Sequence, residues 1–191
     1  MEKIITFLHQ ISPLKPETIL ALAELFSPVE LEANQFFIKE DQYAKEIGFL
    51  ETGIARAFFV TREGKEYNKQ FFVGPTLIGA YASLLTKQKN KIAQQALTPC
   101  KVWKASYAEI ELLYQKFHDF ERLGRKMAEY YFIAKEKKEL EMALLDAENR
   151  YLIFRAEFPT LELKIPQYHI ASYLGISPTQ LSRVRNKMSS R

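Results

Sequence analysis

The feature that most constrains the fold is a run of residues near the C-terminal end of the chain, 166–187. Ala171 is followed four residues later by Gly175, and Ser177 and Pro178 come soon after. A glycine can take the left-handed conformation that ends a helix. A serine caps the N-terminus of the next helix, and a proline suits its first turn. Ala171 is small enough to let a second helix pack closely. The run therefore predicts two short helices that meet at a tight corner.

The apolar residues of this run divide the two helices into an inner and an outer face. Ile170 and Leu174 lie four residues apart on the first helix, which Pro166 begins, and Leu181 and Val184 lie on the inner side of the second. We expect Ile176 to be buried at the corner. The polar residues that remain on the outer face of the second helix are Thr179, Gln180, Ser182, Arg183 and Asn186.

The net charge of +4 comes entirely from the last 27 residues. That segment has no acidic residue, and its basic residues are Arg183, Arg185, Lys187 and Arg191. The rest of the chain has 23 basic and 23 acidic residues. A basic helix face without acids is typical of nucleic-acid binding, and a second helix of this form can enter the major groove of DNA. A solvated basic tail, or a helical hairpin that binds nothing, is the alternative.

Ahead of this unit the hydrophobic period changes twice. Residues up to about Phe26 have helical spacing, and residues 29–104 form short extended segments separated by turns. The segments Ile54–Val60 and Tyr67–Val73 flank a hairpin turn at 62–65. Gly74-Pro75 breaks the next segment, and strands follow near 92–97 and 101–103. Several short strands of this kind predict an antiparallel sandwich or roll in an α+β fold.

Residues 117–146 predict one long helix with an apolar stripe. The stripe follows a three-four rhythm and consists of Phe120, Leu123, Met127, Tyr130 and Ala134. It fits a dimer seam between two such helices and, equally, a face buried against its own domain. A further helix begins near Ala147 and ends by Pro159.

Composition excludes several classes of function. Cys100 is the single cysteine, and the three histidines, His9, His118 and His169, are far apart in the sequence. We therefore expect no metal site, no cofactor and no catalytic site. A cupin-like enzyme would need clustered histidines, and the segment 29–103 has none. No apolar run reaches the roughly 20 residues that cross a bilayer, and no secretory signal is recognisable, so we expect a cytoplasmic protein without a membrane partner.

The order of these elements resembles the catabolite activator/Fnr superfamily of bacterial transcription regulators. The resemblance is carried by the C-terminal corner, by residues 147–151 ahead of it, and by Gly53, the hairpin residues 63–66 and Ile78-Gly79. It implies a cyclic-nucleotide-binding-like jelly roll over residues 1–116, a dimerisation helix over 117–146 and a helix-turn-helix domain over 147–191. We expect no full β-hairpin wing after the second helix, because the sequence ends at Arg191.

The resemblance also implies an effector pocket, and here the sequence departs from the pattern. Members that bind cyclic AMP have a Gly-Glu pair, followed about ten residues later by an arginine for the phosphate. This chain has Gly79-Ala80, with Asn90 or Lys91 at the arginine position. A lysine replaces a bidentate arginine poorly, so we expect no cyclic AMP binding and an effector that is lost or changed. The residues that would line the pocket are Gly79, Ala80, Tyr81, Ser83, Asn90 and Lys91, with Tyr130 and Tyr131 as a lid.

By the same resemblance the partners are a second copy of the chain, double-stranded DNA with a palindromic operator, RNA polymerase and an unidentified small-molecule effector. We expect Arg183, Thr179 and Gln180 to read base edges. The full set of expected DNA-contacting residues is Gln167, Ser177, Pro178, Thr179, Gln180, Ser182, Arg183, Arg185, Asn186 and Lys187. The alternative function is a ligand-sensing or protein-interaction module that no longer regulates DNA.

Overall fold

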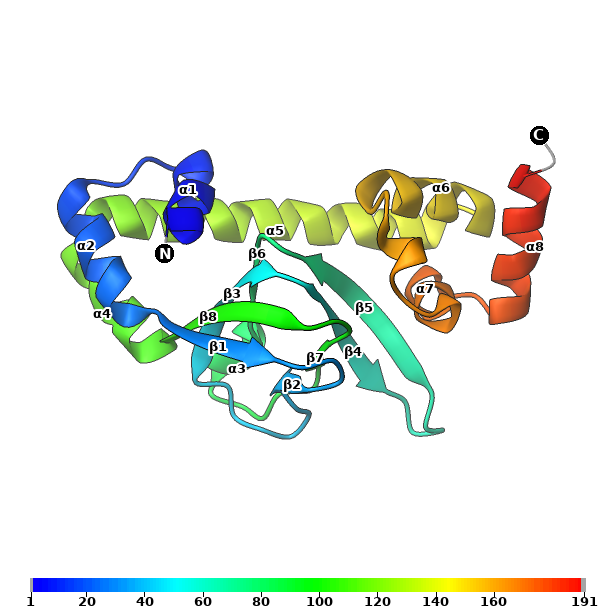
Figure 1. Cartoon of the computed structure of the whole chain (residues 1–191), viewed down its shortest axis with the longest axis horizontal. Helices are drawn as coiled ribbons and strands as arrows, with labels where there is room; N and C mark the ends of the chain where they lie inside the picture. Colours follow the sequence, from blue (N-terminus) through cyan, green and yellow to red (C-terminus); the bar gives the residue numbers. More distant parts are fainter. Residues whose placement is uncertain (1, 190–191) are drawn as a thin grey trace. The chain divides into compact units, whose positions relative to one another are not determined.

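The computed structural model describes residues 2–189, the last of these by its backbone alone, and they form two compact units (Figure 1). The first unit consists of the chain up to Phe59 together with Phe71–Tyr130. The second consists of Val60–Gln70 together with the chain from Tyr131 onward. These units divide the chain at positions other than the expected boundaries at 116 and 146. In particular, the tip of one hairpin belongs to the C-terminal unit.

Two N-terminal helices begin the first unit, as the helical spacing predicts. Helix α1 spans Glu2–Ile11, and helix α2 spans Pro16–Leu25 with its proline in the first turn. Asp119 caps α2 from outside, because its carboxylate accepts from the Lys15 N–H at 2.7 Å and from the Thr18 hydroxyl at 2.9 Å. Burial raises the pKa of Asp119, but these hydrogen bonds to the charged form outweigh it and hold the pKa below its usual value.

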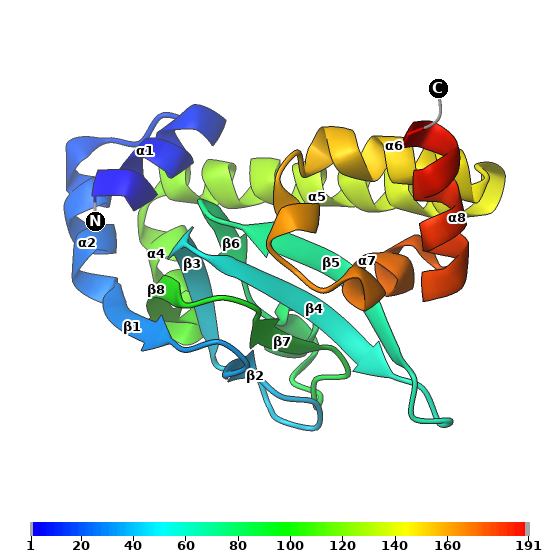
Figure 2. The same ribbon diagram turned by 45° about the vertical axis from the view of Figure 1, so that its right-hand side comes forward.

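Within the described residues, eight strands form two antiparallel four-stranded sheets, which confirms the predicted β roll (Figure 2). One sheet has the order β1-β8-β3-β6 and the other β2-β7-β4-β5. The strands are β1 (Ser27–Leu31), β2 (Phe36–Ile38), β3 (Glu46–Thr52), β4 (Ile54–Val60), β5 (Glu66–Val73), β6 (Thr76–Ile78), β7 (Ala93–Ala96) and β8 (Cys100–Ser106). Strand β4 has the predicted bounds, and the turn after it is closed by the bond from Thr61 N–H to the Lys65 carbonyl. The short strands β2 and β6 and the helix α3 (Tyr81–Thr86) were not predicted.

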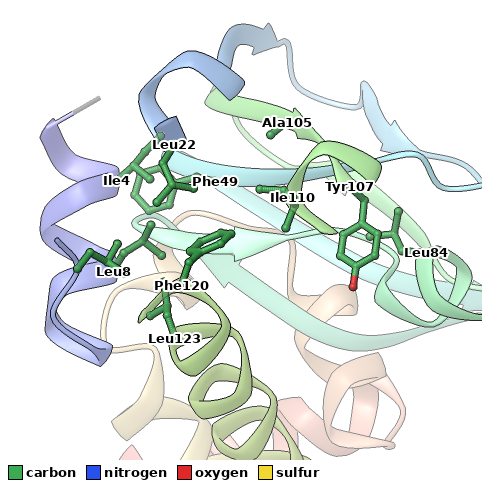
Figure 3. Close-up of a cluster of buried hydrophobic side chains, with 11 residues drawn as sticks. Ile4, Leu8, Leu22, Phe49, Leu84, Ala105, Tyr107, Ile110, Phe120 and Leu123 are labelled. Carbon is green, nitrogen blue, oxygen red and sulfur yellow. The ribbon is translucent and has the colours of Figure 1, made fainter. Parts of the chain in front are cut away.

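A core of the first unit joins both N-terminal helices to the sheet β1-β8-β3-β6 and to two later helices (Figure 3). Helix α4 spans Tyr107–Lys116, and helix α5 spans His118–Leu144. Phe49, which is fully buried on β3, lies in this core. Phe120 and Leu123 of α5 lie in the same core at 5% and 1% exposure. The expected dimer seam is therefore wrong for these two residues, because they face their own unit, and half-buried Met127 packs against the same cluster.

The second unit contains the C-terminal helices, which are labelled α6, α7 and α8 in Figures 1 and 2. They are α6 (Ala147–Glu157), the single turn η1 (Leu161–Leu163), α7 (Gln167–Leu174) and α8 (Pro178–Ser189). Phe154 of α6 packs on Tyr173 of α7 with ring centroids 5.8 Å apart. Lys138 of α5 lies over the same Tyr173 ring, with its Nζ 3.9 Å from the ring centroid. Burial lowers the pKa of Lys138, although the Glu141 carboxylate opposes that shift.

Candidate nucleic-acid interface

The corner between α7 and α8 has the geometry that its glycine predicts. Gly175 has φ +68°, and its N–H bonds to the carbonyls of Ala171 and Ser172 at the end of α7. A Cβ at Gly175 would lie 2.9 Å from the Met142 methyl carbon, so the position tolerates no larger residue without a shift. Ile176 is half-buried rather than buried, because the corner leaves one side of it exposed.

A reciprocal cap begins α8. The Gln180 N–H donates to the Ser177 hydroxyl at 3.2 Å, and the Gln180 side-chain oxygen accepts from the Ser177 N–H at 2.9 Å. This pair is a capping box, which satisfies two backbone donors at the start of the helix. Gln180 therefore has a helix-starting role that the sequence analysis did not assign to it, and its amide nitrogen is the part left to contact a partner.

The outer face of α8 is polar and exposed. Leu181 is 1% exposed and anchors the helix inward, while Val184 is half-buried. The exposed residues are Ser177, Pro178, Thr179, Gln180, Ser182, Arg183, Asn186 and Lys187. This distribution is the one that the apolar spacing predicts. It leaves the first two turns of α8 open to a macromolecular partner.

The basic residues of α8 differ in how they are paired. Lys187 forms an ion pair with Glu148 of α6, and Arg185 lies 4.0 Å from Glu162 of η1. Arg183 is exposed and has no ion pair within residues 2–189. Arg191 lies outside the described residues. The C-terminal segment is free of acids in sequence, but acids from earlier elements neutralise part of its charge.

Glu162 is held in place from two sides. Its second carboxylate oxygen accepts from the Tyr151 hydroxyl at 2.8 Å, while the first faces Arg185. Burial raises the pKa of Tyr151, and the bond to Glu162 acts in the same direction. Gln167 also bonds to η1, because its amide nitrogen donates to the Glu162 carbonyl at 3.2 Å. The Gln167 side-chain oxygen is buried and has no hydrogen-bond partner among the described residues.

These contacts bear on the expected role of Gln167. A phosphate oxygen needs a donor, and one of the two N–H donors of the Gln167 amide already bonds to the backbone of η1. A phosphate contact from this side chain would use the second N–H. Gln167 therefore helps to shape the start of α7, and its expected contact with DNA stays a prediction.

The segment expected to hold an effector uses most of its polar groups internally. The Ser83 hydroxyl accepts from the Ala44 N–H at 3.1 Å and donates to the Gln88 carbonyl at 2.5 Å. Asn90, at 5% exposure, donates to the carbonyls of Lys39 and Ile92 and accepts from the Ile92 N–H. Neither side chain is available to a ligand without the loss of these bonds.

The other residues of that segment offer little more. Gly79 has φ +151° and accepts from Gln94 through its carbonyl at 2.9 Å, and Ala80 is buried. Lys91 is exposed and lies 3.4 Å from Asp41. Tyr81 meets Tyr107 edge-on at 6.0 Å. Tyr130 and Tyr131 lie on α5, and both are exposed to solvent, at 66% and 42%.

Two buried polar residues of the roll were missed by the sequence analysis. Arg56 of β4 is 4% exposed, donates to Gln95 at 2.7 and 3.0 Å, and covers the Phe58 ring. Gln94 is 4% exposed, and its side-chain oxygen has no hydrogen-bond partner in the described chain. The signal for Arg56 was present, because a single charge interrupts the apolar strand Ile54–Val60. The resemblance places the effector-binding arginine after Gly79, whereas Arg56 precedes it on β4.

Comparison with known proteins agrees with this architecture. Residues 28–117 match the family described as the cyclic nucleotide-binding domain. That match covers the β roll. A comparison with curated proteins found no significant sequence match. None of the helices in the described part of the chain has the length and apolarity needed to cross a membrane.

Solved structures resemble nearly the whole chain. FixK2 from Bradyrhizobium japonicum has a TM-score of 0.75 at 17% identity, with 87% of this chain and 85% of that chain covered. The c-di-GMP responsive global regulator CLP from Xanthomonas campestris has a TM-score of 0.73 at 14% identity, with 92% of each chain covered. A protein from Eubacterium rectale, described as a transcriptional regulator of the Crp/Fnr family, has a TM-score of 0.74 at 13% identity, covering 93% of this chain and 84% of its own. The fold is that of the Crp/Fnr regulators, which confirms the resemblance at the level of fold.

Proposed function

We propose that this chain is a transcription regulator of the Crp/Fnr type that binds palindromic DNA as a homodimer through α8. The observation that carries the proposal is the outer face of α8. Polar residues and Arg183 are exposed there, on a helix whose first turn is capped by Ser177 and Gln180. Its structural neighbours include proteins described as regulators, which supports the same assignment. The neighbours are not described as enzymes, and we propose no catalytic activity.

The dimer contact that fits the structure lies on a different face of α5 from the one first expected. Tyr130, Ile133, Leu140 and Leu144 are between 54% and 75% exposed, and they follow heptad spacing. Tyr130 is the residue of the expected seam that stays on this stripe. A second copy of α5 would bury the four side chains between two helices.

We propose that the effector site has lost or changed its ligand and does not take cyclic AMP. Ala80 offers no carboxylate for a ribose hydroxyl, and Ser83 and Asn90 are committed to backbone partners. CLP is described as responsive to c-di-GMP, so a changed effector has a precedent in a neighbour of the same fold. If an anion binds, Lys91 is the cation of this segment to test first.

The experiment that tests the function is selection of bound duplexes from a pool of random DNA. We expect an enriched palindrome whose half-sites lie about 34 Å apart, because two α8 helices of a two-fold dimer meet successive major-groove faces. A pool that shows no enrichment at low salt would leave the ligand-sensing or protein-interaction module as the better account.

Sedimentation tests the dimer with a matched pair of variants. Ile133→Glu places a charge in the proposed stripe, and we expect the dimer to dissociate because each buried carboxylate lacks a partner. Phe132 is 70% exposed but lies about 100° around the helix from Ile133, so Phe132→Glu is the control and should stay dimeric. A monomeric wild-type protein, or equal effects of the two changes, would contradict this seam.

A further inference from the structure

One hairpin of the β roll is bonded to the helix-turn-helix within the C-terminal unit. Residues Val60–Gln70, which join β4 to β5, belong to that unit although they lie inside the 28–117 segment of the cyclic nucleotide-binding domain. The Asn68 N–H donates to the Ser172 hydroxyl of α7 at 2.9 Å, and the Ser172 hydroxyl donates to the Glu66 carbonyl at 2.9 Å. One serine therefore bridges two backbone groups of β5.

The Asn68 side chain makes a second connection to α7. Its amide nitrogen donates to the His169 carbonyl at 3.1 Å and lies 3.3 Å from the His169 ring Nδ1. Asn68 is 1% exposed and His169 is 3% exposed. Because this contact is buried, removing the Asn68 amide would leave the His169 carbonyl without this hydrogen bond in a place that water does not reach freely.

The hairpin also reaches the corner that sets the direction of α8. The Tyr67 hydroxyl lies 3.3 Å from the place a Cβ would occupy on Gly175. Of two consecutive residues of β5, Asn68 thus bonds to the middle of α7 and Tyr67 lies beside its C-terminal corner. The outer face of α8 stays exposed while these contacts are made, so the hairpin orients the motif and does not cover it.

We propose that Asn68 is a positioning residue for DNA binding, acting through His169 and Ser172 on the orientation of α7 and α8. This inference rests on the proposed function.

The test is the spacing preference of the protein on DNA. Two duplexes carry the selected half-sites at the selected spacing and with one base pair inserted, which rotates one half-site by about 34°. We expect wild-type protein to prefer the first duplex at least tenfold. Asn68→Ala should bring the two affinities within about twofold, because loosened helices adapt to either spacing. Partial unfolding would lower both affinities equally and leave their ratio unchanged.

Matched variants separate the hydrogen bonds from the surface around them. Lys69 is exposed on the same strand, and Lys69→Ala should keep the wild-type ratio. Ser172→Ala should reduce the preference between the two spacings as Asn68→Ala does, and it replaces Asn68→Ala in the test if that variant does not fold. Ser172→Thr keeps a hydroxyl and should keep the wild-type preference. Wild-type protein that binds no DNA would overturn the proposed function and this inference together. Wild-type protein that discriminates, with Asn68→Ala and Ser172→Ala discriminating equally well, would overturn the inference alone.

Discussion

The outer face of α8 and the segment 79–91 of the roll are both rich in small polar residues, but they use them in opposite ways. On α8, Ser182, Arg183 and Asn186 are exposed to solvent. In the roll, Ser83 and Asn90 are each 5% exposed and bonded to neighbouring backbone. Polar composition alone therefore does not identify a binding surface. The exposed fraction and the partners of each side chain separate a surface that can meet DNA from a loop that stabilises itself.

The two regions also differ in how their cations are placed. Lys91 lies near Asp41 on a loop, whereas Arg185 and Lys187 meet acids that come from η1 and α6. Glu162 is fixed in turn by Tyr151, so the arginine that faces it is restrained. Acids near a DNA-binding helix reduce its attraction for phosphate, and they also hold the cations in defined positions. This comparison leads to four predictions, from the largest expected effect to the smallest.

The largest effect is expected for Asn90→Ala, and it is on stability. The change removes three hydrogen bonds from a buried site and should lower the free energy of unfolding by about 2–4 kcal/mol. Urea denaturation of the wild-type and variant proteins measures this difference. Lys91→Ala, next to it on the exposed loop, is the control and should change stability by less than about 0.5 kcal/mol. Equal effects of the two changes would mean that the segment is not self-stabilising.

The next effect concerns base reading by α8. Arg183→Ala should weaken binding to the selected duplex by about 1–3 kcal/mol and relax its preference at one base pair. Lys187→Ala should weaken binding to every duplex alike and lower the dependence of log affinity on log salt by about one unit. Fluorescence anisotropy on selected and scrambled duplexes distinguishes these patterns. Identical behaviour of the two variants on both duplexes would contradict the roles assigned.

A smaller change of opposite sign is expected for Glu148→Gln. The substitution frees Lys187 from its ion pair, so DNA affinity should rise by about two- to fivefold at low salt, as expected for an exposed pair. The gain should shrink as salt is added, because screening weakens surface charges. Glu139→Gln, which changes an exposed acid on α5, serves as the charge-matched control. Equal tightening by the two variants would show that net charge, not this pair, limits affinity.

The smallest effect is a predicted absence of binding. Titration calorimetry with cyclic AMP should give no heat of binding at micromolar concentrations, since Ala80 and Asn90 provide neither the acid nor the arginine that the resemblance requires. A measured micromolar affinity would show that other residues of the roll, such as the buried Arg56 and Gln94, hold the nucleotide.

The sequence predicts local features of this molecule well. Gly175 and Ser177 identify the corner, and the turn at 62–65 identifies the hairpin, because these signals depend on neighbours within a few residues. The bounds of β4 follow for the same reason. The Ser177–Gln180 capping box could also have been predicted, since a serine followed three residues later by glutamine is its signature.

The features that the sequence does not predict depend on residues far apart in the chain. The apolar rhythm through Phe120 and Leu123 indicates a buried face, but only the structure shows that the unit's own core covers it. Glu148 lies 39 residues from Lys187, and Asn68 lies 101 residues from His169. No periodicity links such positions, so the pairing of the α8 cations and the hairpin contact with α7 appear only in three dimensions.

The central claim is that the exposed face of α8 recognises a specific DNA sequence. Its most direct test is a titration of wild-type protein with the selected duplex and with a scrambled duplex of the same composition, under identical salt. We predict that the selected duplex binds at least about a thousandfold more tightly, the lower end for specific recognition. Equal affinities for the two duplexes, or no binding to either at low salt, would contradict the account.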